Sequence, residues 1–180
     1  MIRESALIDY LSCCQVETFS GVVYRATRMG LDPTTPSTAG GRWMPREGMA
    51  VLYTSFEREG ALAEMSFHLG MLTPVPSKPI SIHTLQVTSK RLIRLQRTDF
   101  AGVGIDASRF GELDYRRTEV VGDAIGFLEF DAMRVPSARW ECDNLVLLAD
   151  NQDISVAPTV VNTEQVDWLE WAKANGFVAN

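Results

Sequence analysis

Four residues in the N-terminal part of the chain combine types that could do chemistry together. Glu64 lies in the segment 60–69, beside a stripe of apolar residues that recur at helical spacing. Arg25, Arg42 and Tyr53 precede it, in segments with the composition of strands or of loops at strand edges. The four residues predict a site that combines cations, an aromatic ring and a carboxylate.

Each of these residues also has an ordinary structural role. An arginine on a strand, such as Arg25, is often a surface or ion-paired residue, and Tyr53 could be a core aromatic with its hydroxyl bonded. Arg42 follows two glycines, which permit either close approach of a ligand or a tight turn into a buried Trp43. Glu64 could simply pair with a neighbouring base. Taken singly, none of the four is specific.

Local sequence patterns predict a single α+β domain for a chain of 180 residues. The segment 97–115 has no clear pattern. Helices and strands are interspersed, several strands follow one another near the end, and no strand-helix-strand period is evident, which favours α+β over a doubly wound sheet. We expect helices at 4–14 with a Ser5 cap, 58–70, 116–129 and 163–174, and strands at 22–27, 51–54, 80–87, 132–135, 144–148 and 154–161.

Composition excludes several classes of protein. A net charge of −6 argues against a general nucleic-acid binder, although a local cationic pocket is compatible with it. Three cysteines, Cys13, Cys14 and Cys142, have neither a disulfide framework nor metal-ligand spacing, which fits the reducing cytoplasm. No run of about eighteen apolar residues occurs, so neither membrane insertion nor secretion is expected.

The order and spacing of several motifs resemble the RES domain, a family named for arginine, glutamate and serine. The resemblance runs from about residue 24 to 148 of a domain that we take as 1–180, and its motifs concentrate in 24–69 and 127–148. The matching motifs are Tyr24-Arg25, Gly40-Gly41-Arg42-Trp43, Leu52-Tyr53-Thr54-Ser55, Ala61-Leu62-Ala63-Glu64 and Pro136-Ser137.

The resemblance implies a fold similar to the ADP-ribosyltransferase toxins, with mixed or antiparallel strands flanked by helices. It implies a cytoplasmic toxin that consumes NAD as its substrate, without a metal, and that is controlled by an antitoxin of Xre type. Carried over by residue, Glu64, Arg25 and Tyr53 would be catalytic, and Arg25, Arg42, Tyr53 and Ser137 would bind NAD. Ser137 also has an ordinary reading as a turn serine after a proline.

The chemistry asks for such groups independently. Cleavage of the nicotinamide-ribose bond passes through an oxocarbenium-like state that a carboxylate stabilises, the role expected of Glu64. Arginine forks suit the pyrophosphate, and an aromatic face suits the nicotinamide ring. Two departures from the family pattern, at Met44 and at 149–151, concern the local shape of the pocket.

Several alternatives remain at this stage. Inorganic phosphate, water or a protein could accept the ADP-ribose, and a non-catalytic protein-binding module is a rival of another class. The glycine-rich segment 102–107 is a weak dinucleotide fingerprint because no clear strand precedes it. Glu64 and His68, four residues apart, lack further metal ligands, and Cys142 lacks a nearby histidine. The oligomeric state, including a homo-oligomer, stays open.

Overall fold

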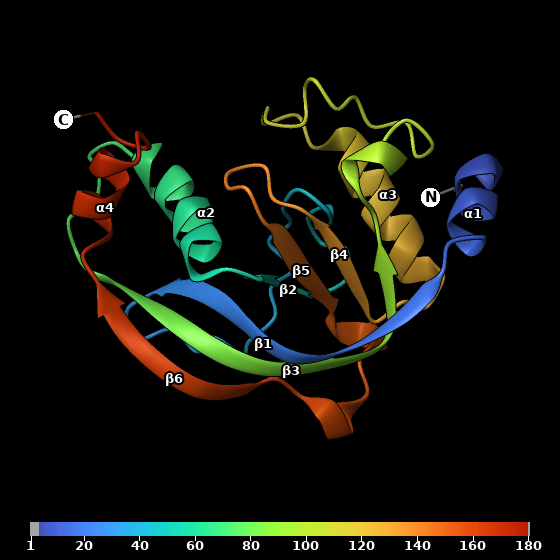
Figure 1. Ribbon diagram of the computed structural model, residues 1–180, viewed down its shortest axis with the longest axis horizontal. Coiled ribbons are helices and arrows are strands. Elements are labelled where there is room, and N and C mark those ends of the chain that lie inside the picture. Colours follow the sequence, from blue (N-terminus) through green and yellow to red (C-terminus); the bar gives the residue numbers. More distant parts are fainter. Residues whose placement is uncertain (1–3, 180) are drawn as a thin grey trace.

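The computed structural model describes residues 4–179, and over this range it has one mixed sheet with helices towards its two ends (Figure 1). The predicted α+β class is confirmed. The domain prediction extends to residues 1–3 and 180, which lie outside the described range. The helices are α1 (Ser5–Ser12), α2 (Arg58–Gly70), α3 (Arg116–Phe127) and α4 (Trp168–Ala174). The strands are β1 (Val16–Arg28), β2 (Val51–Ser55), β3 (Ile80–Arg94), β4 (Ala132–Pro136), β5 (Asp143–Leu148) and β6 (Thr159–Val166).

The sheet has the order β1-β2-β5-β4-β3-β6, and β1 pairs with β3 as well as with β2. This extra pairing joins the first strand of that order to the last but one, so the sheet curls on itself. The strands β3 and β4 are parallel, and the other pairs are antiparallel. Figure 1 shows β1, β3 and β6 sweeping side by side along one edge of the molecule, with the shorter β2, β5 and β4 above them.

Two apolar clusters attach the helices to the sheet. One joins α1 and α3 to β4 and β5 and includes the buried residues Trp43, Ile125 and Val146. The other joins α2 and α4 to β3 and includes Leu62 and Trp168, each with no exposed surface. Figure 1 shows the two helix pairs at opposite ends of the sheet. Neither these helices nor any other within 4–179 is both long and apolar enough to span a bilayer.

The C-terminal elements differ from the sequence prediction. The expected strand at 154–161 is a short 3-10 turn, Ile154–Val156, followed by β6 at Thr159–Val166. The expected helix at 163–174 therefore begins only at Trp168. Backbone pairing with β3 determines β6, and because nearly all of its side chains are exposed, its sequence carries no alternating pattern.

Four other elements have different limits from those expected. The strands β1 and β3 extend well beyond 22–27 and 80–87, because they pair with each other from Val16 opposite Ile93 to Arg28 opposite Ile80. The first helix ends at Ser12, and its N-cap is Glu4 without a side-chain bond, so the prediction of a Ser5 cap was wrong. The helix α3 ends at Phe127.

Candidate active site

Small residues on α2 allow this helix to approach the sheet closely enough to position Glu64. Gly60, Ala61 and Ala63 are buried. A Cβ atom at Gly60 would lie 2.5 Å from Sγ of Cys142 and closer still to Oγ of Ser55, at the end of β2. The first half of α2 therefore packs against β2 and against the hairpin that joins β4 to β5. This packing directs Glu64 towards the hairpin.

The Glu64 carboxylate is held on one side by two hydrogen bonds. Its Oε1 accepts from Oγ of Ser137 at 2.7 Å and from Nδ2 of Asn144 at 3.0 Å. Ser137, which is 1% exposed, also accepts from the backbone N–H groups of Arg139 and Trp140, so its own position is fixed by the hairpin turn. Within residues 4–179, Oε2 of Glu64 has no hydrogen-bond partner. One carboxylate oxygen is thus anchored and the other is available.

Arg25 and Tyr53 meet where β1 runs alongside β2. Nη1 of Arg25 donates to the backbone carbonyl of Tyr53 at 3.3 Å, whereas its Nε is buried without a partner. Burial lowers the pKa of Arg25, and none of the described carboxylates pairs with it. The Tyr53 hydroxyl accepts from the backbone N–H of Trp43 at 3.1 Å, and burial raises its pKa.

Two glycines fit the loop before Arg42 against Tyr53. Gly40 has a φ of +80°, which side chains rarely adopt, and a Cβ at Gly41 would lie 2.8 Å from the Tyr53 hydroxyl. Of the two roles considered for these glycines, the tight turn into a buried Trp43 is present, since Trp43 is 2% exposed, and both glycines also line the cavity described below. Arg42 is left at the edge of the cavity.

Arg42 is engaged with the segment 110–115 rather than with an acid. Its Nη1 and Nη2 donate to the backbone carbonyls of Phe110 and Glu112, at 2.5 and 3.3 Å. Its guanidinium carbon lies 4.7 Å from the ring centre of Phe110 and 4.5 Å from that of Tyr115. Burial is the main cause of its lowered pKa, and the neighbouring Arg139 lowers it further. Arg139 donates to the carbonyl between those two, that of Gly111, at 2.7 Å.

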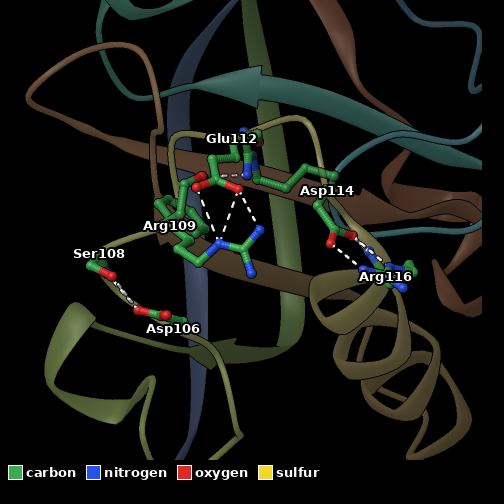
Figure 2. Close-up of polar contacts among 8 residues, drawn as sticks. Asp106, Ser108, Arg109, Glu112, Asp114 and Arg116 are labelled. Atoms are coloured by element: carbon green, nitrogen blue, oxygen red, sulfur yellow. Dashed lines mark hydrogen bonds and ion pairs between the residues drawn. The ribbon is translucent and has the colours of Figure 1, made fainter.

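The segment 106–116 satisfies most of its own charges. Figure 2 shows Arg109 bonded to Glu112, Arg116 bonded to Asp114, and Asp106 accepting from Ser108. The closest distances in the two ion pairs are 2.7 and 2.5 Å. Phe110 anchors the segment in the core, at 4% exposure. The ion pairs of the segment therefore form within it, and Arg42 and Arg139 bond to its backbone carbonyls.

These groups surround a cavity of about 290 Å³, near the lower end of the usual range for small-molecule sites. The structure brings together Arg25, Arg42, Tyr53 and Glu64 on its walls. Ser137 does not line this cavity and reaches it only through its bond to Glu64. Sequence reasoning missed two lining residues as members of this cavity, Tyr115 and Asn144, because both come from segments distant in sequence.

His68 also lines the cavity, one helical turn after Glu64. Burial lowers its pKa, while the Glu64 charge acts in the opposite direction. The imidazole is therefore neutral near pH 7 and could exchange hydrogen bonds with a ligand. Within 4–179, no cluster of three or more histidine, cysteine or carboxylate side chains is arranged to bind a metal.

A larger cleft, of about 880 Å³, lies along the hairpin 136–143. Its lining has three arginines, Arg97, Arg134 and Arg139, and three carboxylates, Glu57, Glu141 and Asp143. Arg134 already bonds to Asp143 at 2.7 Å. Cys142 lies in this cleft with its thiol 3.3 Å from the Ser55 hydroxyl, and burial raises its pKa. A balanced lining and a protonated thiol favour the smaller cavity as the site.

Comparison with known families shows to which family this chain belongs. The sequence model of the RES domain matches residues 17–169. The chain belongs to the RES domain family. The resemblance expected from the motifs is thereby confirmed. A search of curated proteins gave no match.

A solved structure shares the fold of this chain. The crystal structure of the M. tuberculosis MbcT-MbcA toxin-antitoxin complex contains a chain that superposes with a TM-score of 0.82 at 18% sequence identity, covering 96% of this chain and 98% of that one. At this identity the likeness shows the fold alone. An anti-CRISPR protein matches with a TM-score of only 0.36 and 10% identity, over 82% of this chain and 96% of that one, too weak to bear on the fold.

The two departures from the family pattern lie away from the cavity walls of this RES domain. Met44 is 1% exposed in the core, and its carbonyl accepts from the backbone N–H of Gly41 at 2.9 Å. Residues Ala149–Asn151 form a 3-10 turn in which Nδ2 of Asn151 donates to the carbonyls of Gly126 and Phe130. Met44 thus packs in the core, and Asn151 bonds to backbone carbonyls outside the cavity.

Proposed function

We propose that this RES domain degrades NAD by cleaving the bond between nicotinamide and ribose, and that it is the toxin of a toxin-antitoxin pair. The observation that carries the proposal is the Glu64 carboxylate, which is anchored through Oε1, has no partner at Oε2 within residues 4–179, and shares one cavity with Arg25 and Arg42. A fixed carboxylate and two arginines that pair with none of the described carboxylates suit a substrate that carries phosphate and develops positive charge during reaction.

In the proposed reaction the bond between C1′ of the ribose and the pyridinium nitrogen breaks, and its electron pair neutralises the departing nicotinamide. The ribose then carries the oxocarbenium-like charge, which the Glu64 carboxylate stabilises because it is already oriented. An oxygen of inorganic phosphate or of water forms the new bond to C1′. Attack by water also releases one proton.

The arginines supply the binding energy for the diphosphate. The Arg25 guanidinium is half-buried, and its Nε has no partner among the described residues. Burial also makes its positive charge unfavourable, as the lowered pKa indicates. A phosphate oxygen would both accept from the unpaired Nε–H and compensate the charge. The cavity is too small to enclose a whole dinucleotide, so we place the nicotinamide-ribose half inside it and the adenosine half outside. The Tyr53 ring on the cavity wall suits the nicotinamide.

The family membership and the fold shared with a chain of a toxin-antitoxin complex support a controlling partner protein. We expect that partner to be an antitoxin of Xre type and the pair to act in the cytoplasm. An arginine-lined cavity suits blockage by an acidic segment of such a partner.

Nicotinamide release from NAD by the purified chain tests the activity. Glu64→Gln should keep the fold and lose about a hundredfold or more in turnover, as other electrostatic stabilisers do when removed. The matched control is Glu59→Gln on the same helix, because Glu59 pairs with Arg58 and does not line the cavity. Unchanged release by folded Glu64→Gln would refute the role of Glu64.

Product analysis separates the acceptors. Phosphorolysis gives a phosphorylated ADP-ribose and depends on added phosphate, hydrolysis gives ADP-ribose, and transfer to protein raises the intact mass of an incubated cell protein. The absence of nicotinamide release under all three conditions would leave the non-catalytic binding module. In cells, expression without the partner should stop growth and lower NAD, and Glu64→Gln should abolish both effects. Growth arrest at unchanged NAD would refute the mechanism.

A further inference from the structure

Asn144, at the start of β5, is placed by two neighbouring strands. It lies opposite Ser55 of β2 and Val135 of β4. The central strand position fixes its backbone, and the side chain forms part of the cavity wall. Asn144 therefore has a defined position beside Glu64 without depending on the hairpin tip.

The bond to Glu64 determines which end of the Asn144 amide faces which way. A carboxylate accepts hydrogen bonds, so the amide must present Nδ2 to Oε1 of Glu64, as the 3.0 Å bond shows. The amide oxygen Oδ1 then points away from Glu64. Within the described residues this oxygen is buried and has no hydrogen-bond partner. An unpaired buried acceptor is uncommon in folded proteins, and it calls for a donor from elsewhere.

We infer that Asn144 is a substrate-binding residue whose Oδ1 accepts a hydrogen bond from a hydroxyl of the ribose on which Glu64 acts. This inference rests on the proposed function and names the part of the substrate that Asn144 recognises. Oδ1 and Nδ2 of Asn144 are bonded to the same carbon, and Nδ2 bonds to Glu64, so Oδ1 lies close to the Glu64 carboxylate. Oε2 of Glu64 and Oδ1 of Asn144 are thus two neighbouring acceptors, and the 2′ and 3′ hydroxyls of ribose are two neighbouring donors.

The rest of the cavity wall supports a hydroxyl as the donor. Arg25 and Arg42 contribute only donors to a ligand. Glu64 and Asn144 contribute the side-chain acceptors that adjoin each other, so the donors of the ligand belong on their side. A ribose that bonds both would be held with C1′ close to the anchored carboxylate. Asn144 therefore has two tasks, to orient Glu64 through Nδ2 and to orient the ribose through Oδ1.

The experiment compares kcat/KM for NAD with that for analogues that lack the 2′ or the 3′ hydroxyl on the nicotinamide ribose. In the wild type, removal of the bonded hydroxyl should cost roughly ten- to a hundredfold. In Asn144→Ala that cost should fall to about threefold or less for one of the two hydroxyls, because the acceptor is absent. The control Asn162→Ala, an exposed position on β6, should keep the full cost.

Asn144→Asp tests the other task. It keeps the shape of the side chain but replaces the donor to Glu64 by a second carboxylate oxygen. Turnover of NAD by Asn144→Asp should therefore fall at least as far as that of Asn144→Ala. A residue that only packs would tolerate the isosteric change and fail with alanine.

Two outcomes would overturn the inference separately from the proposed function. If the wild type releases nicotinamide and Asn144→Ala is slowed by one factor for all three substrates, Asn144 binds no ribose hydroxyl. If the wild type releases no nicotinamide, the proposed function fails, and calorimetry with ADP-ribose and its deoxyribose analogues takes the place of kinetics. In that case equal effects of Asn144→Ala on all ligands, or no binding by the wild type, would refute the contact.

Discussion

Ser137 and Glu64, 73 residues apart in the sequence, are joined by a hydrogen bond of 2.7 Å. The serine hydroxyl donates to the carboxylate while it accepts from two backbone N–H groups of its own turn. We expect Ser137→Ala to lower kcat for NAD cleavage by roughly ten- to a hundredfold, the value of a hydrogen bond to a charged group, with little change in KM. Steady-state kinetics measure this.

The control for Ser137→Ala is Ser89→Ala. Ser89 lies on strand β3, outside the cavity lining, and is as buried as Ser137. Its hydroxyl donates to the buried carboxylate of Asp131. Both variants should lose about 1–3 kcal/mol of unfolding free energy, but Ser89→Ala should keep the wild-type kcat. If the two variants lose kcat equally, Ser137 acts through stability and has no particular role at Glu64.

Arg25 and Arg42 should respond differently to replacement by lysine. Lysine keeps the charge but loses the planar fork, so Arg25→Lys should raise the KM for NAD roughly tenfold with little change in kcat. Arg42→Lys should raise KM in the same way and also speed hydrogen exchange in 110–112, because Arg42 holds two of those carbonyls. Arg116→Lys, at 87% side-chain exposure, is the control. NAD affinity that calorimetry finds unaltered in both variants would remove the arginines from the binding site.

Gly122, in the middle of α3, packs directly against the backbone of the loop that carries Arg42. A Cβ atom there would lie 1.6 Å from the carbonyl oxygen of Trp43, the residue that follows Arg42. Gly122→Ala should therefore lower the unfolding free energy by about 2–4 kcal/mol, since backbone must move. Gly111→Ala has free space around its Cβ and should change stability by less than about 1 kcal/mol. Urea denaturation distinguishes the two, and similar midpoints would contradict the predicted clash.

Acid should destabilise the fold through His83. Its two ring nitrogens bond to the hydroxyls of Thr27 and Thr163, each at 2.8 Å, and burial, with a smaller effect of Arg25, lowers its pKa from 6.5. The unfolded chain therefore binds a proton more readily than the folded one. The unfolding free energy should fall as the pH drops below about 6.5 and stop falling, for this residue, below its folded-state pKa.

The measurement is urea denaturation of the wild type and of His83→Gln at pH about 7.5 and about 5.5. The glutamine variant should lose less stability between the two pH values. His68, whose pKa is also lowered, is present in both proteins and contributes equally to them. Equal losses in both proteins would show that His83 is not the linked group.

The sequence predicted those parts of the fold whose signals are local. The helix at 58–70 and the strand at 144–148 were correct to within a residue, because apolar spacing and a terminal glycine mark them. The strand β6 was misplaced because its residues are exposed and it exists through its bonds to β3. The second half of β3, 88–94, is also determined by partners distant in the chain.

The candidate site divides in the same manner. The family motifs led to Arg25, Arg42, Tyr53 and Glu64, which do share one cavity. The role of Asn144 could not be read from its neighbours, because its bond to Glu64 spans 80 residues and depends on the register of β5. Ser137 was expected to bind NAD, but in the structure it contacts Glu64 and not the cavity; its role in binding stays a prediction.

The attachment of Arg42 to the carbonyls of Phe110 and Glu112 has a consequence for measured affinity. Each Nη of Arg42 uses one hydrogen on these carbonyls, so the guanidinium, which has five N–H groups, keeps three for a phosphate. A phosphate then binds to a guanidinium whose position is already set, and little side-chain freedom is lost on binding. A substitution that weakens the hold of the segment 110–112 without touching Arg42 is therefore expected to weaken the binding of NAD as well as the stability.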